Sequence, residues 1–374
     1  MRAAFERADL VAEALARIRA GGPLLVTGPP GAGKTTLLES AADALAADGW
    51  QPVYLDLFGA AASPERFVHS ALAALPDGLE GRAASRARDA RQLARAGHGE
   101  GARAVHALFA AWTALDEADG RPVALILDEP TEIRSLAYFP GLREVDAPFA
   151  AALGARSRGT LLATSFPGLA QRLWPQVATL PLPPLSAAEL QLEARRRGLR
   201  VEGTALAAAS AGWPRYARIL LDRLHDGASL AAAWADEMAL GGRLEQACRN
   251  TYETLLLRSR GYGMSKAVLS AVAAEEGLNL TALVARLGRT PGAIRDYLGW
   301  LLAVDALRVA SKRYYYVDGL LRLWVRLHAR GVRASEAEIA ECAREAVSAT
   351  DGGAGPAESL PAPATRHQGL MEID

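Results

Sequence analysis

Short apolar runs alternate with amphipathic segments along the first half of the chain. An uninterrupted apolar run of four to six residues is typical of a strand buried on both faces of a sheet. Runs of this length that are wholly or largely apolar lie at residues 24–27, 52–57, 122–127, 160–164 and 177–182. The amphipathic segments before and between these runs predict helices at residues 5–20, 35–47, 64–75 and 102–118. Strands that alternate with helices predict an α/β fold, in which helices sandwich a parallel sheet.

The pattern changes after the proline-rich stretch at residues 181–184. Ser186 is followed three residues later by Glu189, the spacing of a capping box at the start of a helix. Helical periodicity then continues to residue 258, which predicts an all-α unit.

A third unit follows, with three short helices and then a β-rich segment at residues 307–317. A further helix is expected at residues 334–349, and the Gly- and Pro-rich tail from Asp351 predicts disorder. Residues 76–101 carry five arginines among Gly and Ala, and we expect an exposed insertion there. The predicted units are residues 1–185, 186–260, 261–333 and 334–374.

The amino-acid composition excludes several classes of protein. The chain has 374 residues, half of them hydrophobic, which excludes wholesale disorder and suggests more than one domain. Only two cysteines, Cys248 and Cys342, are present and lie far apart, which excludes a disulfide framework. The first ten residues lack the apolar core of a secretion signal, and no run of about 18 uncharged apolar residues occurs. We therefore expect a cytoplasmic protein with no membrane partner.

The charges are unevenly placed, although 42 basic residues balance 42 acidic ones. Residues 260–333 hold 12 basic and 5 acidic side chains, so this region is strongly positive. Of the basic residues 39 are Arg, and the three lysines are Lys34, Lys266 and Lys312. A position that still carries a lysine therefore stands out in this chain.

Lys34 lies in the strongest motif of the sequence. Residues 28–35 read G-P-P-G-A-G-K-T and match the phosphate-binding pattern G-x-x-x-x-G-K-[ST] between a predicted strand and a predicted helix. Glycines let backbone N–H groups surround phosphate oxygens, and the helix N-terminus adds positive charge. Lys34 supplies a compact ammonium for the β- and γ-phosphates, and the Thr35 hydroxyl is a candidate ligand of Mg²⁺. The predicted nucleotide contacts are Gly28, Pro29, Pro30, Gly31, Ala32, Gly33, Lys34, Thr35 and Thr36.

Two carboxylates follow the third predicted strand, about 95 residues after the phosphate loop. Asp128 is placed to hold Mg²⁺, and Glu129 to polarise the water that attacks the γ-phosphate. A second acid makes hydrolysis of ATP to ADP a prediction, because binding alone does not require a base. The next strand ends in Thr164 and Ser165, and either hydroxyl is a candidate to orient the attacking water.

The order of these motifs resembles the AAA+ ATPases, and among them the archaeal-type ATPases near the origin-recognition initiators and the STAND signalling ATPases. Phe5-x-Arg7-x-x-Leu10 is similar to the short box that precedes the phosphate loop in this family. Gly212-Trp213-Pro214-Arg215 is similar to the family's lid segment. The segment that leads into Ser186 resembles the junction between strand and lid.

The resemblance implies roles for further residues and a P-loop NTPase fold with a helical lid. It places Arg7 near the adenine, and Pro214 and Arg215 at the nucleotide, with Arg215 as a γ-phosphate sensor. It also implies a nucleotide-dependent homo-oligomer, in which Arg172 of one subunit acts as arginine finger for its neighbour. Arg158 is a weaker candidate for that role.

Residues 262–318 predict a winged helix. Thr290 and Pro291 have the positions of an N-cap and a first helical residue, so a recognition-like helix begins there. The segment from 308 to 317 corresponds to the wing. Where such a domain meets DNA, this chain has Arg289, Arg295, Lys312 and Arg313. Winged helices also bind proteins, so double-stranded DNA and a partner protein both stay open.

Two functions follow from the sequence. In the first, the chain is a Mg²⁺-dependent ATPase switch that couples its nucleotide state to the winged helix. In the second, it is a STAND-type scaffold that keeps ATP or ADP bound, has negligible turnover and binds protein through the winged helix.

Overall fold

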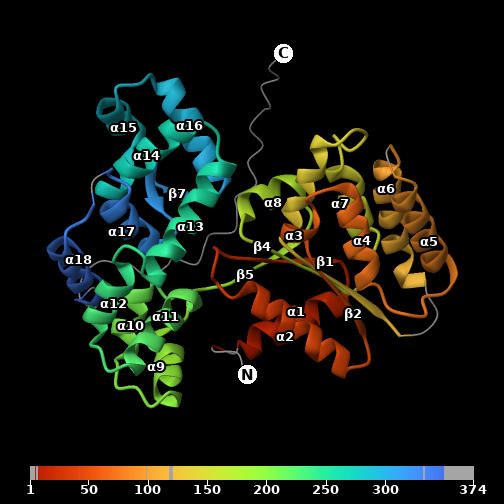
Figure 1. The fold of residues 1–374 in the computed structure, drawn as a ribbon, viewed down its shortest axis with the longest axis horizontal. Helices are drawn as coiled ribbons and strands as arrows, with labels where there is room; N and C mark the ends of the chain where they lie inside the picture. The colour runs from red at the N-terminus through yellow and green to blue at the C-terminus, as the bar shows by residue number, and fades with distance from the viewer. Residues whose placement is uncertain (1–4, 6, 98, 118–120, 332, 349–374) are drawn as a thin grey trace.

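The computed structural model describes residues 5, 7–97, 99–117, 121–331 and 333–348. These residues form two lobes (Figure 1), one built around a parallel sheet and one almost wholly helical. The tail from residue 351, for which disorder was predicted, lies outside the described residues.

Five parallel strands form the sheet of the N-terminal lobe, in the order β2-β3-β4-β1-β5. Strand β1 lies between β4 and β5, so the chain changes direction across the sheet at β1, where α/β proteins bind ligands. All six residues of β3 are buried, as the unbroken apolar run predicts. The strands are β1 Pro23–Thr27, β2 Gln51–Asp56, β3 Val123–Asp128, β4 Thr160–Thr164 and β5 Ala178–Pro181.

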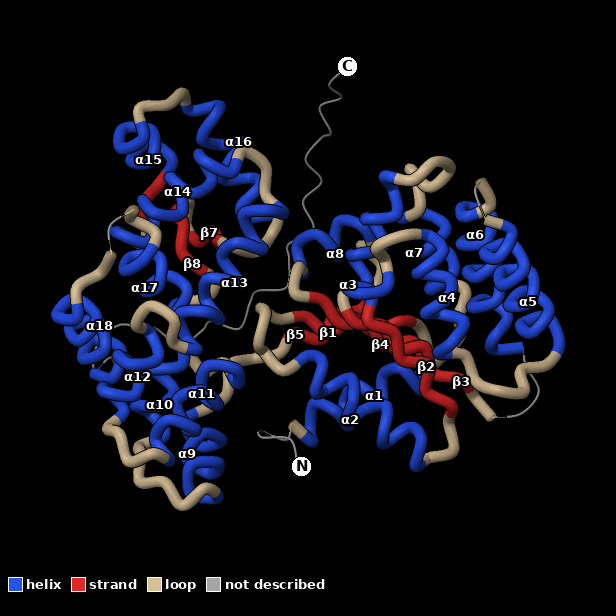
Figure 2. The backbone as a smooth tube through the Cα atoms, viewed as in Figure 1, coloured by secondary structure: helices blue, strands red, loops and turns tan. Residues whose placement is uncertain are grey.

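Helices cover both faces of this sheet (Figure 2). Alternate strand residues point to opposite faces. Leu24 and Val26 pack with α1 (Ala8–Ala20) and α2 (Lys34–Ala47), whereas Leu25 belongs to the core of the opposite face. The helices of that opposite face include α4 (Pro64–Ala74), α5 (Gly81–Ala96), α6 (Gly101–Thr113) and α7 (Asp146–Gly154). The predicted sheet sandwiched by helices is thus confirmed.

The segment expected to be an exposed insertion is instead a packed helix. Ala83, Ala87 and Ala90 form a buried stripe of small side chains along α5, and this helix lies against α6. The arginines of α5 lie on its outer face, so the high Arg content describes one side of the helix only.

Some short elements of this lobe carry no clear sequence signal. They are α3 (Leu57–Ala60), the 3₁₀ segments Ala114–Glu117 and Pro130–Tyr138 (η1 and η2), and α8 (Pro167–Leu173). Helix α7 was likewise not predicted. Three of these elements, α3, η2 and α8, follow the strand ends directly and so border the candidate site.

The C-terminal lobe begins with the predicted capping box. The Ser186 hydroxyl accepts a hydrogen bond from the Glu189 amide, and the Glu189 carboxylate accepts one from the Ser186 amide. Five helices follow. They are α9 Ala187–Arg196, α10 Gly203–Ser210, α11 Pro214–His225, α12 Leu230–Met238 and α13 Arg243–Arg258.

The next segment contains the three predicted helices and a small antiparallel sheet, one strand of which, β6, lies between the first two helices and was not predicted. Asn279 and Thr290 cap the second and third of these helices through their side chains. The strands pair in the order β6-β8-β7. The elements are α14 Tyr262–Ala274, β6 Leu278–Asn279, α15 Leu280–Leu287, α16 Pro291–Ala303, β7 Leu307–Ala310 and β8 Arg313–Tyr316.

The last two helices join these parts into one lobe. Helix α18 (Glu336–Ser348) packs back on α10 and α12, and α17 (Gly319–His328) packs on α13 and α14. The buried Asp318, at the start of α17, accepts hydrogen bonds from the Tyr216 hydroxyl of α11 (2.7 Å) and from two amides of its own helix. Within the described part of the chain, no helix is both long and apolar enough to cross a bilayer.

The Asp318→Ala variant tests this junction. It leaves the buried Tyr216 hydroxyl and the first amides of α17 without their acceptor, so we expect a loss of about 3 kcal/mol in the free energy of unfolding. Urea denaturation followed by tryptophan fluorescence measures it. The matched control is Asp226→Ala, which removes an exposed carboxylate paired with Arg223 and should change stability by less than about 1 kcal/mol. Equal losses of stability in the two variants would contradict a role of Asp318 in joining α11 to α17.

Candidate nucleotide-binding and hydrolysis site

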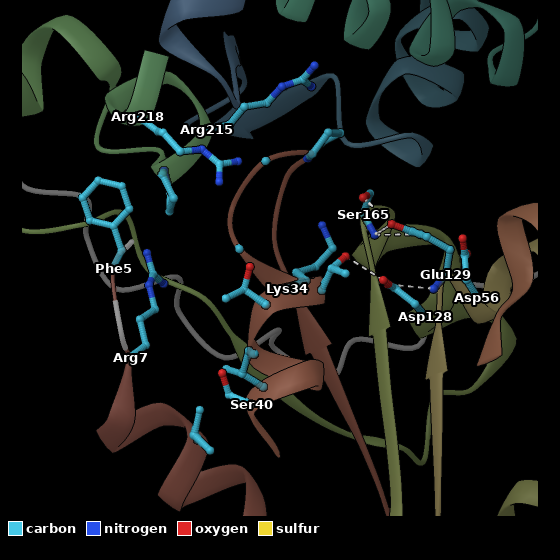
Figure 3. A pocket seen from close by; sticks show the side chains of 18 of the residues that line it. Phe5, Arg7, Lys34, Ser40, Asp56, Asp128, Glu129, Ser165, Arg215 and Arg218 are labelled. Carbon is cyan, nitrogen blue, oxygen red and sulfur yellow. Dashed lines mark hydrogen bonds between the residues drawn. The ribbon is translucent and has the colours of Figure 1, made fainter. Parts of the chain in front are cut away.

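A cavity of about 460 Å³ lies between the carboxyl edge of the sheet and α11 of the C-terminal lobe (Figure 3). The N-terminal lobe supplies the phosphate loop, the ends of β2, β3 and β4, and the segment before α1. The C-terminal lobe supplies Pro214, Arg215 and Arg218. A ligand in this cavity would therefore contact both lobes.

The phosphate loop is shaped by its glycines. Gly31 and Gly33 have φ of 86° and 92°, a region that side chains rarely adopt. A Cβ on Gly31 would also meet the Cβ of Arg215 at 2.7 Å, so the close approach of α11 itself requires glycine there. The predicted loop residues that line the cavity are Pro30, Gly31, Gly33, Lys34, Thr35 and Thr36.

The other three predicted loop residues support the loop from behind. The carbonyls of Gly28 and Pro29 accept hydrogen bonds from the Lys34 ammonium at 2.9 and 3.1 Å, and Ala32 is fully buried. Burial lowers the pKa of Lys34, while the carboxylates of Glu129 and Asp128 act in the opposite direction. The Lys34 charge is thus held inside the loop, where phosphate oxygens would compensate its desolvation.

The two predicted metal ligands lie together. The Thr35 hydroxyl donates to Oδ2 of Asp128 at 2.6 Å, and the Tyr54 hydroxyl approaches the same oxygen at 3.3 Å. A hydroxyl and a carboxylate are the hard oxygen ligands that Mg²⁺ takes, usually together with waters and phosphate oxygens. Among the described residues no group of three or more His, Cys, Asp or Glu could hold an ion by itself. The donor set therefore fits Mg²⁺ carried on a nucleotide.

Glu129 is tied to the end of the neighbouring strand β4. Its carboxylate accepts hydrogen bonds from the Ser165 amide (2.9 and 3.0 Å to its two oxygens), from the Ser165 hydroxyl and from the Thr164 hydroxyl (3.2 Å). Burial raises the pKa of Glu129, and the Lys34 charge and the bonds from Ser165 oppose that rise. The backbone of Glu129 is left-handed, with φ of 47°, which is uncommon for a residue other than glycine.

The two hydroxyls at the end of β4 have different surroundings. Ser165 lines the cavity. Thr164 is fully buried, and its hydroxyl accepts a hydrogen bond from the Phe166 amide at 3.1 Å. Of the two sequence candidates, Ser165 is the one that faces the cavity.

Arg215 and Arg218 lie on one face of α11, three residues apart, and point in different directions in Figure 3. The Arg215 amide donates to the Gly31 carbonyl at 3.2 Å, and its side-chain stem lies on Gly31. The Arg215 guanidinium points away from the phosphate loop. Burial raises the pKa of Asp318, and the charge of Arg215 is the smallest of several effects that oppose this rise. The Arg218 guanidinium points into the cavity. Sequence reasoning missed Arg218, although its spacing from Arg215 places it on the same face.

The far end of the cavity is formed by Phe5, Arg7 and Val11. Both terminal nitrogens of Arg7 are buried and have no hydrogen-bond partner within the described chain. Burial lowers the pKa of Arg7, and Glu189 partly opposes this. Orphaned buried donors beside an aromatic ring fit a ligand with a flat ring and acceptor atoms, as a nucleotide has.

Asp56 and Phe58 are further cavity residues that the sequence did not single out. Asp56 is paired in register with Asp128 across β2 and β3, and its side chain caps α3 through the Phe58 amide at 2.9 Å. The signal available was positional, because Asp56 is the second-last residue of the predicted strand 52–57 and so lies near the same sheet edge as Asp128.

The remaining predicted residues lie outside the cavity. Arg172 is an exposed residue of α8. Burial raises the pKa of Asp305 in the C-terminal lobe, and the charge of Arg172 opposes this rise. Four other exposed residues lie around the turn before α16, on α16 and around the β7–β8 turn: Arg289, Arg295, Lys312 and Arg313. One of them, Arg313, donates to the Gly277 carbonyl at 2.7 Å.

Comparisons with known proteins agree with this architecture. Residues 5–137 match the model of the family described as AAA ATPase domain. The Walker-type ATPase of Pyrococcus abyssi has a similar fold, with a TM-score of 0.64 and 16% identity over 86% of this chain and 96% of that one. A search of the curated proteins found no match.

Two further solved structures are more distant. The RuvB Holliday junction branch migration motor of Thermotoga maritima gives a TM-score of 0.36 at 18% identity, over 83% of this chain and 92% of that one. Cdc6p of Pyrobaculum aerophilum gives 0.37 at 13%, over 93% and 96%. The family match covers residues 5–137 of the N-terminal lobe, and the similarity to the Pyrococcus abyssi protein concerns the fold.

Proposed function

We propose that this chain is a Mg²⁺-dependent ATP-binding and ATP-hydrolysing switch, whose nucleotide state is coupled to the C-terminal lobe. One observation carries the proposal. The phosphate loop, the Thr35–Asp128 pair and Glu129 all border a single cavity, and α11 of the other lobe closes that cavity.

Different residues bind the nucleotide, hold the metal ion and promote hydrolysis. The loop amides and Lys34 bind the phosphates, and Phe5 and Arg7 bind the base and sugar end. Thr35 and Asp128 hold Mg²⁺, which when bound neutralises charge on the phosphates. Glu129 orients and deprotonates the attacking water, and Ser165 positions Glu129.

The lid residues make the cavity sensitive to the γ-phosphate. Arg218 supplies a cation on the cavity wall that belongs to the other lobe. Loss of the γ-phosphate would remove a partner of this cation and weaken the attraction between the lobes. The proposed arginine finger, Arg172, would act on a neighbouring subunit in a homo-oligomer.

The second candidate is a nucleotide-loaded scaffold with negligible turnover. Its support is that Ser165 and Thr164 together supply three hydrogen-bond donors to the Glu129 carboxylate. A carboxylate engaged in this way is occupied by the protein rather than by a water. The scaffold therefore predicts binding without hydrolysis.

The Glu129→Gln variant separates the two candidates. For a hydrolysing switch we expect turnover to fall by about 100-fold or more, with ATP affinity nearly unchanged, because a general base is lost. Since only the ionised carboxylate acts as a base and burial raises its pKa, wild-type turnover should fall with decreasing pH at a value above the 4.5 usual for glutamate. Phosphate release and binding of a fluorescent ATP analogue measure these quantities.

The Lys34→Ala variant is the control for binding and should lose affinity for ATP. A wild-type protein that binds ATP but does not hydrolyse it would favour the scaffold. Absence of ATP binding in the wild type, or unchanged affinity in Lys34→Ala, would contradict both candidates.

The Arg218→Ala variant tests the lid cation. Removal of one charge-assisted contact to a phosphate should weaken ATP binding about tenfold. The matched control is Arg223→Ala on the same helix, whose side chain pairs with Asp226 and Asp236 outside the cavity. Titration with the same fluorescent analogue compares the two, and equal affinities would exclude a role for Arg218 in binding.

We also propose that residues 262–318 are a winged helix that contacts double-stranded DNA. The support is the positive charge of residues 260–333 and the exposure of Arg289, Arg295 and Lys312. Replacing these three by Ala should reduce the slope of log affinity against log salt by about 3, because each phosphate contact contributes about one.

Fluorescence anisotropy with a labelled duplex measures this slope. The matched control replaces three exposed arginines of α5, namely Arg86, Arg91 and Arg95, and should leave the slope unchanged. If the wild type binds no DNA, or if both triple variants behave alike, the surface is a candidate for protein contact instead.

A further inference from the structure

Arg258, the last residue of α13, reaches from the C-terminal lobe to two segments of the N-terminal lobe. Its guanidinium forms an ion pair with Glu132 of η2. The same guanidinium lies over the ring of Phe166, 4.2 Å from the ring centroid. Phe166 is buried, and the side chains of Arg258 and Glu132 are only 24% and 13% exposed, so solvent screens this contact poorly.

Both partners of Arg258 are close in sequence to the residues that perform hydrolysis in the proposed function. Phe166 directly follows Ser165. Glu132 lies three residues after Glu129, and its amide donates to the Glu129 carbonyl at 3.0 Å. The turns after β3 and β4 are therefore joined twice, through Glu129 and Ser165 at the cavity and through Arg258 at the lobe interface.

A second residue of the C-terminal lobe holds the same turn further along. Asp305, just after α16, accepts a hydrogen bond from the Gly168 amide at 2.9 Å. The approach is close, because a Cβ on Gly168 would lie 3.1 Å from Oδ1 of Asp305. Residues 165–168 are thus bonded to Glu129 at one end and to the C-terminal lobe at Phe166 and Gly168.

The chemistry of arginine suits this position. Its planar guanidinium can stack on a ring and still direct N–H groups at a carboxylate, whereas an ammonium provides a point charge without a stacking face. One side chain therefore connects both turns.

We propose that Arg258 is a positioning residue for the Glu129–Ser165 pair, so that the geometry for hydrolysis is complete only while the C-terminal lobe is docked. The inference rests on the proposed ATPase function and adds that the lobe controls turnover through the turns after β3 and β4. Separation of the lobes removes Arg258 from Glu132 and Phe166 and releases both turns.

The Arg258→Ala variant tests the proposal in the full chain. We expect kcat to fall about tenfold or more, with the Kd for ATP within about twofold of wild type, because small displacements of a base reduce the rate without removing phosphate contacts. Arg258→Lys, which keeps the charge and loses the stacking face, should give an intermediate rate. The matched control is Arg260→Ala, an exposed residue two positions later, which should leave kcat unchanged.

A charge exchange separates positioning from general stability. The Arg258→Glu and Glu132→Arg variants should each lower kcat, and the double variant should recover part of it, since the pair is restored in reverse. An equal loss of kcat in Arg258→Ala and Arg260→Ala, or no recovery in the double variant, would overturn the inference.

Amide hydrogen exchange gives a readout that does not depend on hydrolysis. In Arg258→Ala the peptide containing Ser165–Gly168 should exchange faster than in the wild type, while peptides of β1 should not change. If the wild type lacks turnover, the proposed function fails, and exchange alone then decides whether Arg258 holds the turn. If the wild type hydrolyses ATP and Arg258→Ala changes neither kcat nor exchange, only the role of Arg258 fails.

Discussion

Parallel pairing of β3 with β4, and of β4 with β1, is the constraint on which the site depends. In register, Asp128 lies opposite Ala163, and Thr27 lies opposite Thr164. The phosphate loop, the acid pair and Ser165 therefore leave the sheet at one edge, although they are up to about 135 residues apart in sequence. The hydrogen bonds from Thr35 to Asp128 and from Ser165 to Glu129 are direct consequences of this alignment.

The second lobe turns this edge into a cavity. The N-terminus of α11 packs on the phosphate loop, where Gly31 leaves room for the stem of Arg215. The Arg215 guanidinium points away from the phosphate loop, and the Arg218 guanidinium points into the cavity instead. Both arginines therefore lie beside the cavity on one face of α11, but only the Arg218 guanidinium points into it.

Among the described residues, the contacts that connect the lobes near the site include α11 on the phosphate loop, Arg258 on Glu132 and Phe166, and Asp305 on Gly168. Burial raises the pKa of Asp305 to about 6, against the smaller effects of the Gly168 amide and Arg172. Since ionisation opposes burial of this carboxyl, its contribution to the stability of the folded chain is fully present below the ordinary pKa of 3.8 and is lost as the pH rises through about 6.

The sequence alone predicted the strands of the large sheet, most of the longer helices and the candidate chemistry of this protein. The strands, the capping box, the phosphate loop and the acid pair depend on spacing within about eight residues, so local patterns are sufficient to find them. The same patterns predicted an exposed insertion where the structure has α5, because its many arginines outweighed the stripe of buried alanines. They also gave no reason to prefer Thr164 or Ser165. Only the tertiary structure decided that Ser165 faces the cavity, that Arg218 enters it and that Arg258 reaches the turn after β4. Each of these depends on contacts between residues distant in sequence, and no local period or propensity encodes such contacts.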